Sequence, residues 1–177
     1  GGNHEYYENF AEELKDLGVQ VTMYDQLGSW YSDQPDFSKP ENVAKFLNMD
    51  YFINEVEEVR QKLGLDHFYL IGQSWGGLLT QEYALRYQEH LKGIIISSMT
   101  DNIAEYITNI NAIREKEFSA EDLVFMKKCE AENNYDNPRY QKLIDVLNRG
   151  YVDRKQPPAI SHLTSTIATD VYNYFQG

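Results

Sequence analysis

The stretch Leu70-Ile71-Gly72-Gln73-Ser74-Trp75-Gly76-Gly77 decides the fold. The apolar run 67–71 leads into it, and such a run is typical of a buried strand. Gly72, Ser74 and Gly76 have the spacing Gly-x-Ser-x-Gly, which places a serine on a sharp turn between a strand and a helix. We expect residues two before and two after the serine to be small, because the backbone is crowded there. The pattern predicts a serine nucleophile, and its alternative is a glycine-rich turn with an ordinary surface serine.

The helix that follows the turn adds to this hypothesis. Its N-terminus would point at the serine and favour an oxygen that becomes negative during a reaction. A serine hydroxyl still needs a base to take its proton, so the rest of the chain has to be searched for a histidine and a carboxylate.

Composition limits the classes of function. The chain has 177 residues, 42% of them hydrophobic, which is enough for one domain or slightly more with a real core. A net charge of −12 argues against a nucleic-acid partner and against an anionic membrane. The single cysteine, Cys129, permits no internal disulfide and fits a cytoplasmic location, although a leader could precede Gly1. No run approaches the ~18 apolar residues of a membrane span, and we expect neither a metal nor a cofactor.

Helical and strand patterns alternate in the first half of the chain. The expected order is helix 4–17, strand 19–24, helix 48–63, strand 67–71, helix 76–88 and strand 91–98. This alternation predicts an α/β fold with a parallel sheet covered by helices on both faces. In the last of these strands, Ile94-Ile95-Ile96 should be buried.

The helix at 48–63 should have one buried and one solvated face. Its apolar stripe is Phe52, Val56, Val59 and Leu63. The charged residues between them are expected to face water, and they are Glu55, Glu57, Glu58, Arg60 and Lys62.

After residue 98 the pattern becomes helical. We expect helices at 101–117, 119–133, 137–147 and 160–175, with Pro157-Pro158 as a break. No strand is expected there. We therefore predict two domains, the N-terminal part of an α/β core at 1–98 and an incomplete helical cap at 99–177.

The partners that the serine needs are missing from the expected positions. His90 lies at the far end of the helix after Ser74, about 20 Å away at 1.5 Å per residue. His162 falls in the helical block, where a base of this fold is not expected. His4 is expected to cap a helix or to stand at the mouth of a pocket, and Asp25 to brace a loop. The simplest interpretation is an internal fragment that lacks the acid and the base.

The chain resembles the proline iminopeptidases, or prolyl aminopeptidases, of the α/β-hydrolase superfamily. The segment Gly72-Gln73-Ser74-Trp75-Gly76-Gly77 is similar to their nucleophile turn, and Gly1-x-x-His4-x-Tyr6 is similar to the end of their glycine loop. Two further segments match, Tyr24-Asp25-Gln26-Leu27-Gly28-Ser29 and the Val171-Tyr172 to Gln176-Gly177 stretch.

The resemblance implies a partial α/β-hydrolase fold and a role for particular residues. Ser74 would form the acyl-enzyme, and the backbone N–H of Trp75 would be one oxyanion donor. The glycine loop that ends near Gly1 would supply the other donor, and Gly1 and Gln73 are assigned to substrate binding. The acid, the base and the glutamates that bind the substrate's amino group would lie beyond Gly177.

The implied function is release of N-terminal proline from short peptides, with this chain by itself inactive. Two alternatives stay open: an esterase or amidase of the same fold, and a non-catalytic binding module with a hydrolase-like fold. Related folds that use an aspartate nucleophile are disfavoured by Ser74. The oligomeric state is not predicted.

Overall fold

The computed structural model describes residues 3–152 and 167–176. They form two compact units, one of residues 3–99 with 167–176 and the other of residues 100–152. Each unit is described by itself. The predicted division into domains at residue 98 stays a prediction.

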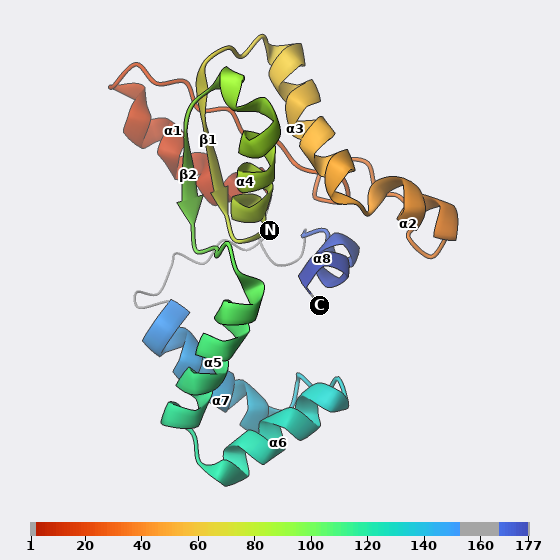
Figure 1. The fold of residues 1–177 in the computed structure, drawn as a ribbon, viewed down its shortest axis with the longest axis vertical. Helices are drawn as coiled ribbons and strands as arrows, with labels where there is room; N and C mark the ends of the chain where they lie inside the picture. The colour runs from red at the N-terminus through yellow and green to blue at the C-terminus, as the bar shows by residue number, and fades with distance from the viewer. Residues whose placement is uncertain (1–2, 153–166, 177) are drawn as a thin grey trace. The chain divides into compact units, whose positions relative to one another are not determined.

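A parallel pair of strands is the centre of the first unit (Figure 1). Strand β1 (Phe68–Gln73) pairs with β2 (Leu91–Ser97), with Ile71 opposite Ile95 and Gln73 opposite Ser97. Helix α4 (Trp75–Tyr87) and a 3-10 turn (Gln88–His90) form the crossover between them. The strand–helix–strand order and the parallel direction confirm the predicted α/β class.

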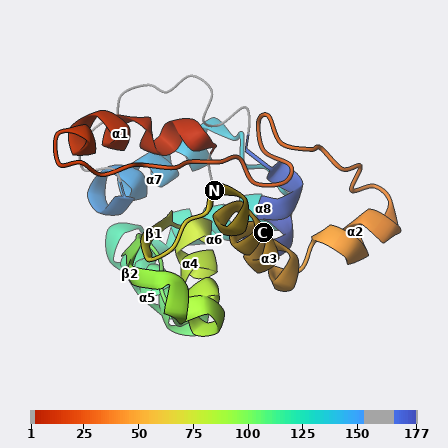
Figure 2. The same ribbon diagram turned by 90° about the horizontal axis from the view of Figure 1, so that it is seen from above.

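Helices lie on both sides of the strands (Figure 2). Helix α1 (Glu8–Lys15), which follows a 3-10 turn (His4–Tyr7), is on the side opposite α4. Helix α3 (Met49–Leu63) packs beside α4. Asn48 begins α3 because its side chain accepts the Tyr51 N–H at 2.8 Å, as an N-cap does.

Helix α8 (Thr169–Gln176) contributes to the same core. Phe175 lies 4.5 Å from the ring of Trp75 and 5.9 Å from the ring of Phe52, measured between ring centroids. Phe52 is fully buried, and Val171 of α8 belongs to the same cluster. A helix from the end of the described chain therefore packs directly beside the residue that follows Ser74.

Two expectations about strands were wrong. Residues 19–24 have no regular secondary structure, because a strand needs a neighbour to complete its ladder and neither β1 nor β2 pairs with them. In β2, residues Ile94, Ile95 and Ile96 are 39–49% exposed instead of buried. Among the described residues no third strand lies beside β2 to cover its outer edge.

The face assignment of α3 also needs correction, and one helix was missed. Glu57 is buried, not solvated, because its carboxylate binds Arg60, Gln61 and Tyr83. Glu55 is half-buried, whereas Leu63, expected inside, is exposed. Helix α2 (Pro40–Phe46) was not predicted, although Pro40 at its first turn is a common start signal.

The second unit is helical, as predicted. It contains α5 (Ile103–Glu117), α6 (Ala120–Ala131) and α7 (Pro138–Leu147), followed by a π-helical turn (Asn148–Val152). Asn102, Ser119 and Asn137 cap the three helices. Met126, Cys129 and Tyr140 form its core.

The second half of the predicted helix 160–175 is α8, while residues 153–166 lie outside the described part. Within residues 3–152 and 167–176, no helix has both the length and the apolar character needed to cross a membrane.

Candidate active site

Ser74 occupies a strained position between β1 and α4. Its backbone has φ 51° and ψ −122°, a region that L-residues rarely adopt, and this strain costs of order 1–3 kcal/mol. The surrounding backbone holds it there: the Ser74 N–H donates to Ser97 O at 2.9 Å, and the Gly77 N–H donates to Ser74 O at 2.8 Å. The Ser74 side chain does not cap α4, so its hydroxyl is not committed to the helix.

The glycines around Ser74 differ in how closely other atoms surround them. A Cβ on Gly72 would overlap the carbonyl group of Gly76 and the hydroxyl of Thr80, so only glycine fits. A Cβ on Gly77 would come 2.7 Å from the Cβ of Met99. A Cβ on Gly76 would meet nothing within 4 Å among the described residues. The expected crowding is therefore present at Gly72, but at Gly76 it is the carbonyl group that matters.

Trp75 is held from two sides. Its ring packs between Phe52 and Phe175, and it is 5% exposed. Its indole Nε1–H donates to Oε1 of Gln26 at 3.1 Å. Because Trp75 is the first residue of α4, its backbone N–H has no partner within the helix and is placed like an oxyanion donor.

Of the two other predicted site residues, Gln73 is described and Gly1 is not. Gln73 ends β1, directly before Ser74 and opposite Ser97. Gly1, His162 and Gly177 lie outside the described residues. Their predicted roles, together with those of Ser74, Trp75 and Gln73, stay predictions.

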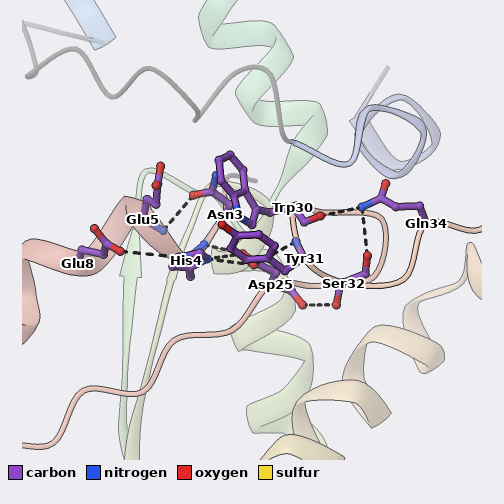
Figure 3. A network of polar contacts seen from close by, with 9 residues as sticks. All are labelled: Asn3, His4, Glu5, Glu8, Asp25, Trp30, Tyr31, Ser32 and Gln34. Atoms are coloured by element: carbon purple, nitrogen blue, oxygen red, sulfur yellow. Dashed lines mark hydrogen bonds and ion pairs between the residues drawn. The ribbon is translucent and has the colours of Figure 1, made fainter.

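A loop beside the serine turn is organised by Asp25 (Figure 3). Its carboxylate accepts the backbone N–H of His4 at 2.8 Å and lies 3.0 Å from Nδ1 of the same residue through both oxygens. The Asp25 side chain is 7% exposed. The Ser32 hydroxyl donates to Asp25 O at 2.7 Å and closes the loop. Asp25 therefore braces the loop as expected, and it does so through His4.

His4 is not arranged as the base for Ser74. Its Nδ1 faces Asp25, and its Nε2 faces Glu8 Oε1 at 3.7 Å, so both ring nitrogens point at carboxylates (Figure 3). His67 precedes β1 and His90 follows α4, which places both at the end of these elements away from Ser74. Among the described histidines, none is therefore positioned as the catalytic base.

A half-buried carboxylate, Glu55, lies under the same loop. Glu55 Oε1 accepts the Leu27 N–H at 2.9 Å, whereas Oε2 is buried without a hydrogen-bond partner in the described residues. Burial raises the pKa of the Glu55 carboxyl to about 7, the Leu27 N–H opposes this, and Glu58 adds to it. Burial and the charge of Glu55 likewise raise the pKa of Tyr24.

Sequence reasoning missed the roles of Gln26 and Glu55. Gln26 binds Trp75 across 49 positions of sequence. Its neighbour Asp25 was expected to brace this loop, but no local signal indicated which side chain reaches the serine turn. Glu55 looked like part of a charged helix face, and only the loop that folds over it removes it from water.

A strand, a strained serine and a helix whose N-terminus faces that serine are the local features expected of an alpha/beta hydrolase fold. The chain belongs to the alpha/beta hydrolase fold family, whose pattern matches residues 1–119. The resemblance to proline iminopeptidases is confirmed by curated relatives of that name. The chain is 36% identical over 181 residues to the proline iminopeptidase of Elizabethkingia meningoseptica. It is 38% identical over 146 residues to that of Chitinophaga pinensis.

The matches cover most of this chain but only about half of the length of each relative. The Elizabethkingia match covers 98% of this chain but 58% of the relative, and the Chitinophaga match covers 81% and 47%. Among solved structures, the proline iminopeptidase of Mycobacterium smegmatis is 25% identical with a TM-score of 0.72, covering 97% of this chain and 53% of that one. VinJ, at 24% identity and a TM-score of 0.80, covers 98% and 58% and supports the fold.

Proposed function

We propose that the natural protein that carries this sequence is a serine aminopeptidase that releases N-terminal proline from peptides. The observation that carries the proposal is the backbone of Ser74, which has a positive φ directly before α4. A non-glycine residue is kept in such a strained conformation where the surroundings force it, and this happens most often at functional sites. The curated relatives named proline iminopeptidase supply the substrate class.

The proposed reaction is acyl transfer. The Ser74 Oγ attacks the carbonyl carbon of the N-terminal proline and its proton passes to a base. The backbone N–H of Trp75 donates to the oxygen that becomes negative. The bond from this carbon to the nitrogen of the next residue breaks, and that nitrogen takes the proton. Water then hydrolyses the ester on Ser74 and releases proline.

The base and the acid of this reaction are not assigned to the described residues. His4, His67 and His90 face other groups or lie at the wrong end of their elements. We therefore expect this chain by itself to be inactive and the complete active site to need further residues. Residues 99–177 stay proposed as an incomplete helical cap.

The experiment compares two substrates on the natural protein. A prolyl amide reporter and a simple ester of similar size are assayed with wild type and with Ser74→Ala. The proposal expects fast release from the prolyl amide, lost in the variant. Ester turnover alone would move the function to an esterase. No Ser74-dependent turnover of either substrate would leave the binding module as the better interpretation.

A further inference from the structure

Two consecutive side chains of the loop after residue 24 each hold a residue that is distant in sequence. The Asp25 carboxylate accepts the backbone N–H of His4. The Gln26 side chain accepts the indole N–H of Trp75, the residue whose backbone N–H is an expected oxyanion donor. One contact joins the loop to residue 4, earlier in the sequence, and the other joins it to residue 75, later in the sequence.

The loop is itself fixed, so it can transmit position. The Leu27 N–H is bound to Glu55 of α3 at 2.9 Å, and the Gly28 N–H donates to Asp33 O at 2.8 Å. Leu27 is buried in the core that also contains Trp75. The Ser32 hydroxyl binds Asp25 O. Because these bonds fix the loop, we expect it to set where its two partners lie.

Trp75 is the more informative partner, because its ring and its backbone N–H belong to one residue at the start of α4. Phe52 and Phe175 restrain the ring by packing, but apolar contacts do not fix rotation as a hydrogen bond does. The bond to Gln26 supplies that direction. Its loss would let the first turn of α4 shift by fractions of an ångström, which is the scale on which oxyanion donors lose effect.

We propose that Gln26 is a positioning residue that sets where the backbone N–H of Trp75, the expected oxyanion donor beside Ser74, lies, and that Asp25 supports it by fixing the same loop to His4. Neither side chain touches the substrate. Asp25 acts through the backbone at His4, and Gln26 acts through Trp75. The inference rests on the proposed hydrolysis through Ser74, and it adds which residues tune that site.

The test measures reaction at Ser74 in two ways in the natural protein. One is the rate constant for phosphonylation of Ser74 by a small fluorophosphonate, which needs the oxyanion donors but no proline pocket. The other is kcat and KM for the prolyl amide. Gln26→Leu removes the acceptor at similar volume, and Gln26→Glu keeps an acceptor oxygen. Gln34→Leu is the matched control, since among the described residues the Gln34 amide donates to the carbonyl oxygens of Trp30 and Ser32 on the exposed side of the loop.

Gln26→Leu is expected to lower both the phosphonylation rate and kcat by about 10–100-fold, with KM within about twofold. Gln26→Glu should recover most of the loss, and Gln34→Leu should match wild type. Asp25→Ala should likewise lower kcat more than it raises KM. In a Trp75→Phe background, Gln26→Leu should have little further effect, because the indole donor is already gone.

Other results overturn the inference. A rise in KM with unchanged kcat would make Gln26 a substrate-binding residue. Unchanged rates per folded molecule, with only a lower melting temperature, would leave a structural role. Full additivity with Trp75→Phe would remove the proposed route through the indole. If wild-type Ser74 is phosphonylated but the prolyl amide is not cleaved, the proposed substrate fails while the phosphonylation comparison still decides the positioning role. If the fluorophosphonate does not label Ser74, both fail.

Discussion

The Tyr83 hydroxyl donates a 2.8 Å hydrogen bond to Oε2 of Glu57, which joins α4 to α3. Tyr83 is fully buried, and the same carboxylate accepts two bonds from Arg60 at 2.8 and 2.9 Å. The bonds from Arg60 lower the pKa of the Glu57 carboxyl to about 2, against the opposing effect of burial. The Glu57 carboxylate therefore stays ionised at neutral pH, and its bond from Tyr83 fixes α4, which begins directly after Ser74, against α3.

Removing this hydroxyl should destabilise the protein without a change in volume. We expect Tyr83→Phe to lower the free energy of unfolding by about 2 kcal/mol, since a buried bond to a charged acceptor is lost. Urea unfolding measures it. Tyr87→Phe is the control, because the Tyr87 ring packs against Tyr83 at an angle of 35° while no hydrogen bond to its hydroxyl is present in the described residues. Equal losses in the two variants would contradict the role of the Glu57 bond.

The raised pKa of Glu55 predicts an unusual pH dependence of the free energy of unfolding. Its carboxyl has a pKa of about 7, above the ordinary value of 4.5, so between these values the folded state binds more protons than the unfolded state. Stability from this group is therefore full below about pH 4.5 and is lost as the pH rises to about 7. Glu55→Gln should unfold like wild type at pH 4 and be about 2–3 kcal/mol more stable at pH 8.

Urea unfolding of wild type and Glu55→Gln across pH 4–8 makes that measurement. Glu41→Gln, on the exposed surface of α2, changes the net charge by the same amount without burial and should not reproduce the effect. A constant difference between wild type and Glu55→Gln at all pH values would show that the carboxyl does not titrate in this range.

Gly72 and Gly76 should differ sharply in how much stability is lost when each is replaced by alanine. Gly72→Ala is expected to prevent correct folding or to cost more than 4 kcal/mol, because the new methyl overlaps the Gly76 carbonyl. Gly76→Ala should be neutral or stabilising by up to about 1 kcal/mol, since it lies within α4 with space around it. Melting temperatures of the two variants measure the contrast. Similar losses in both would mean that crowding surrounds Gly76 after all.

The backbone strain at Ser74 should reduce the free energy of unfolding by a measurable amount. Ser74→Gly relieves the positive φ, whereas Ser74→Ala keeps a Cβ in the same conformation. Both variants lack the hydroxyl and should be inactive. Ser74→Gly is expected to be about 1 kcal/mol more stable than Ser74→Ala in denaturant unfolding. A less stable glycine variant would argue that the turn is not strained.

The sequence by itself determined the local elements that depend on short-range chemistry. The strands predicted at 67–71 and 91–98 correspond to β1 and β2 at 68–73 and 91–97, and the helix between them began directly after Ser74. Caps at Asn48, Ser119 and Asn137 fixed helix starts within one residue, because a cap bond joins groups only two or three positions apart. The Gly72-x-Ser74 spacing predicted the sharp turn for the same reason.

Only the tertiary structure decided what depends on contacts between distant segments. Residues 19–24 alternate like a strand but form none, since a ladder needs a second strand in reach. Glu55 and Glu57 read as solvated charges until a loop and Tyr83 cover them. The bonds from Gln26 to Trp75 and from Asp25 to His4 span 49 and 21 positions, and no periodicity encodes such a meeting. Local bonding follows from sequence order, whereas burial and long-range pairing follow from how the chain packs on itself.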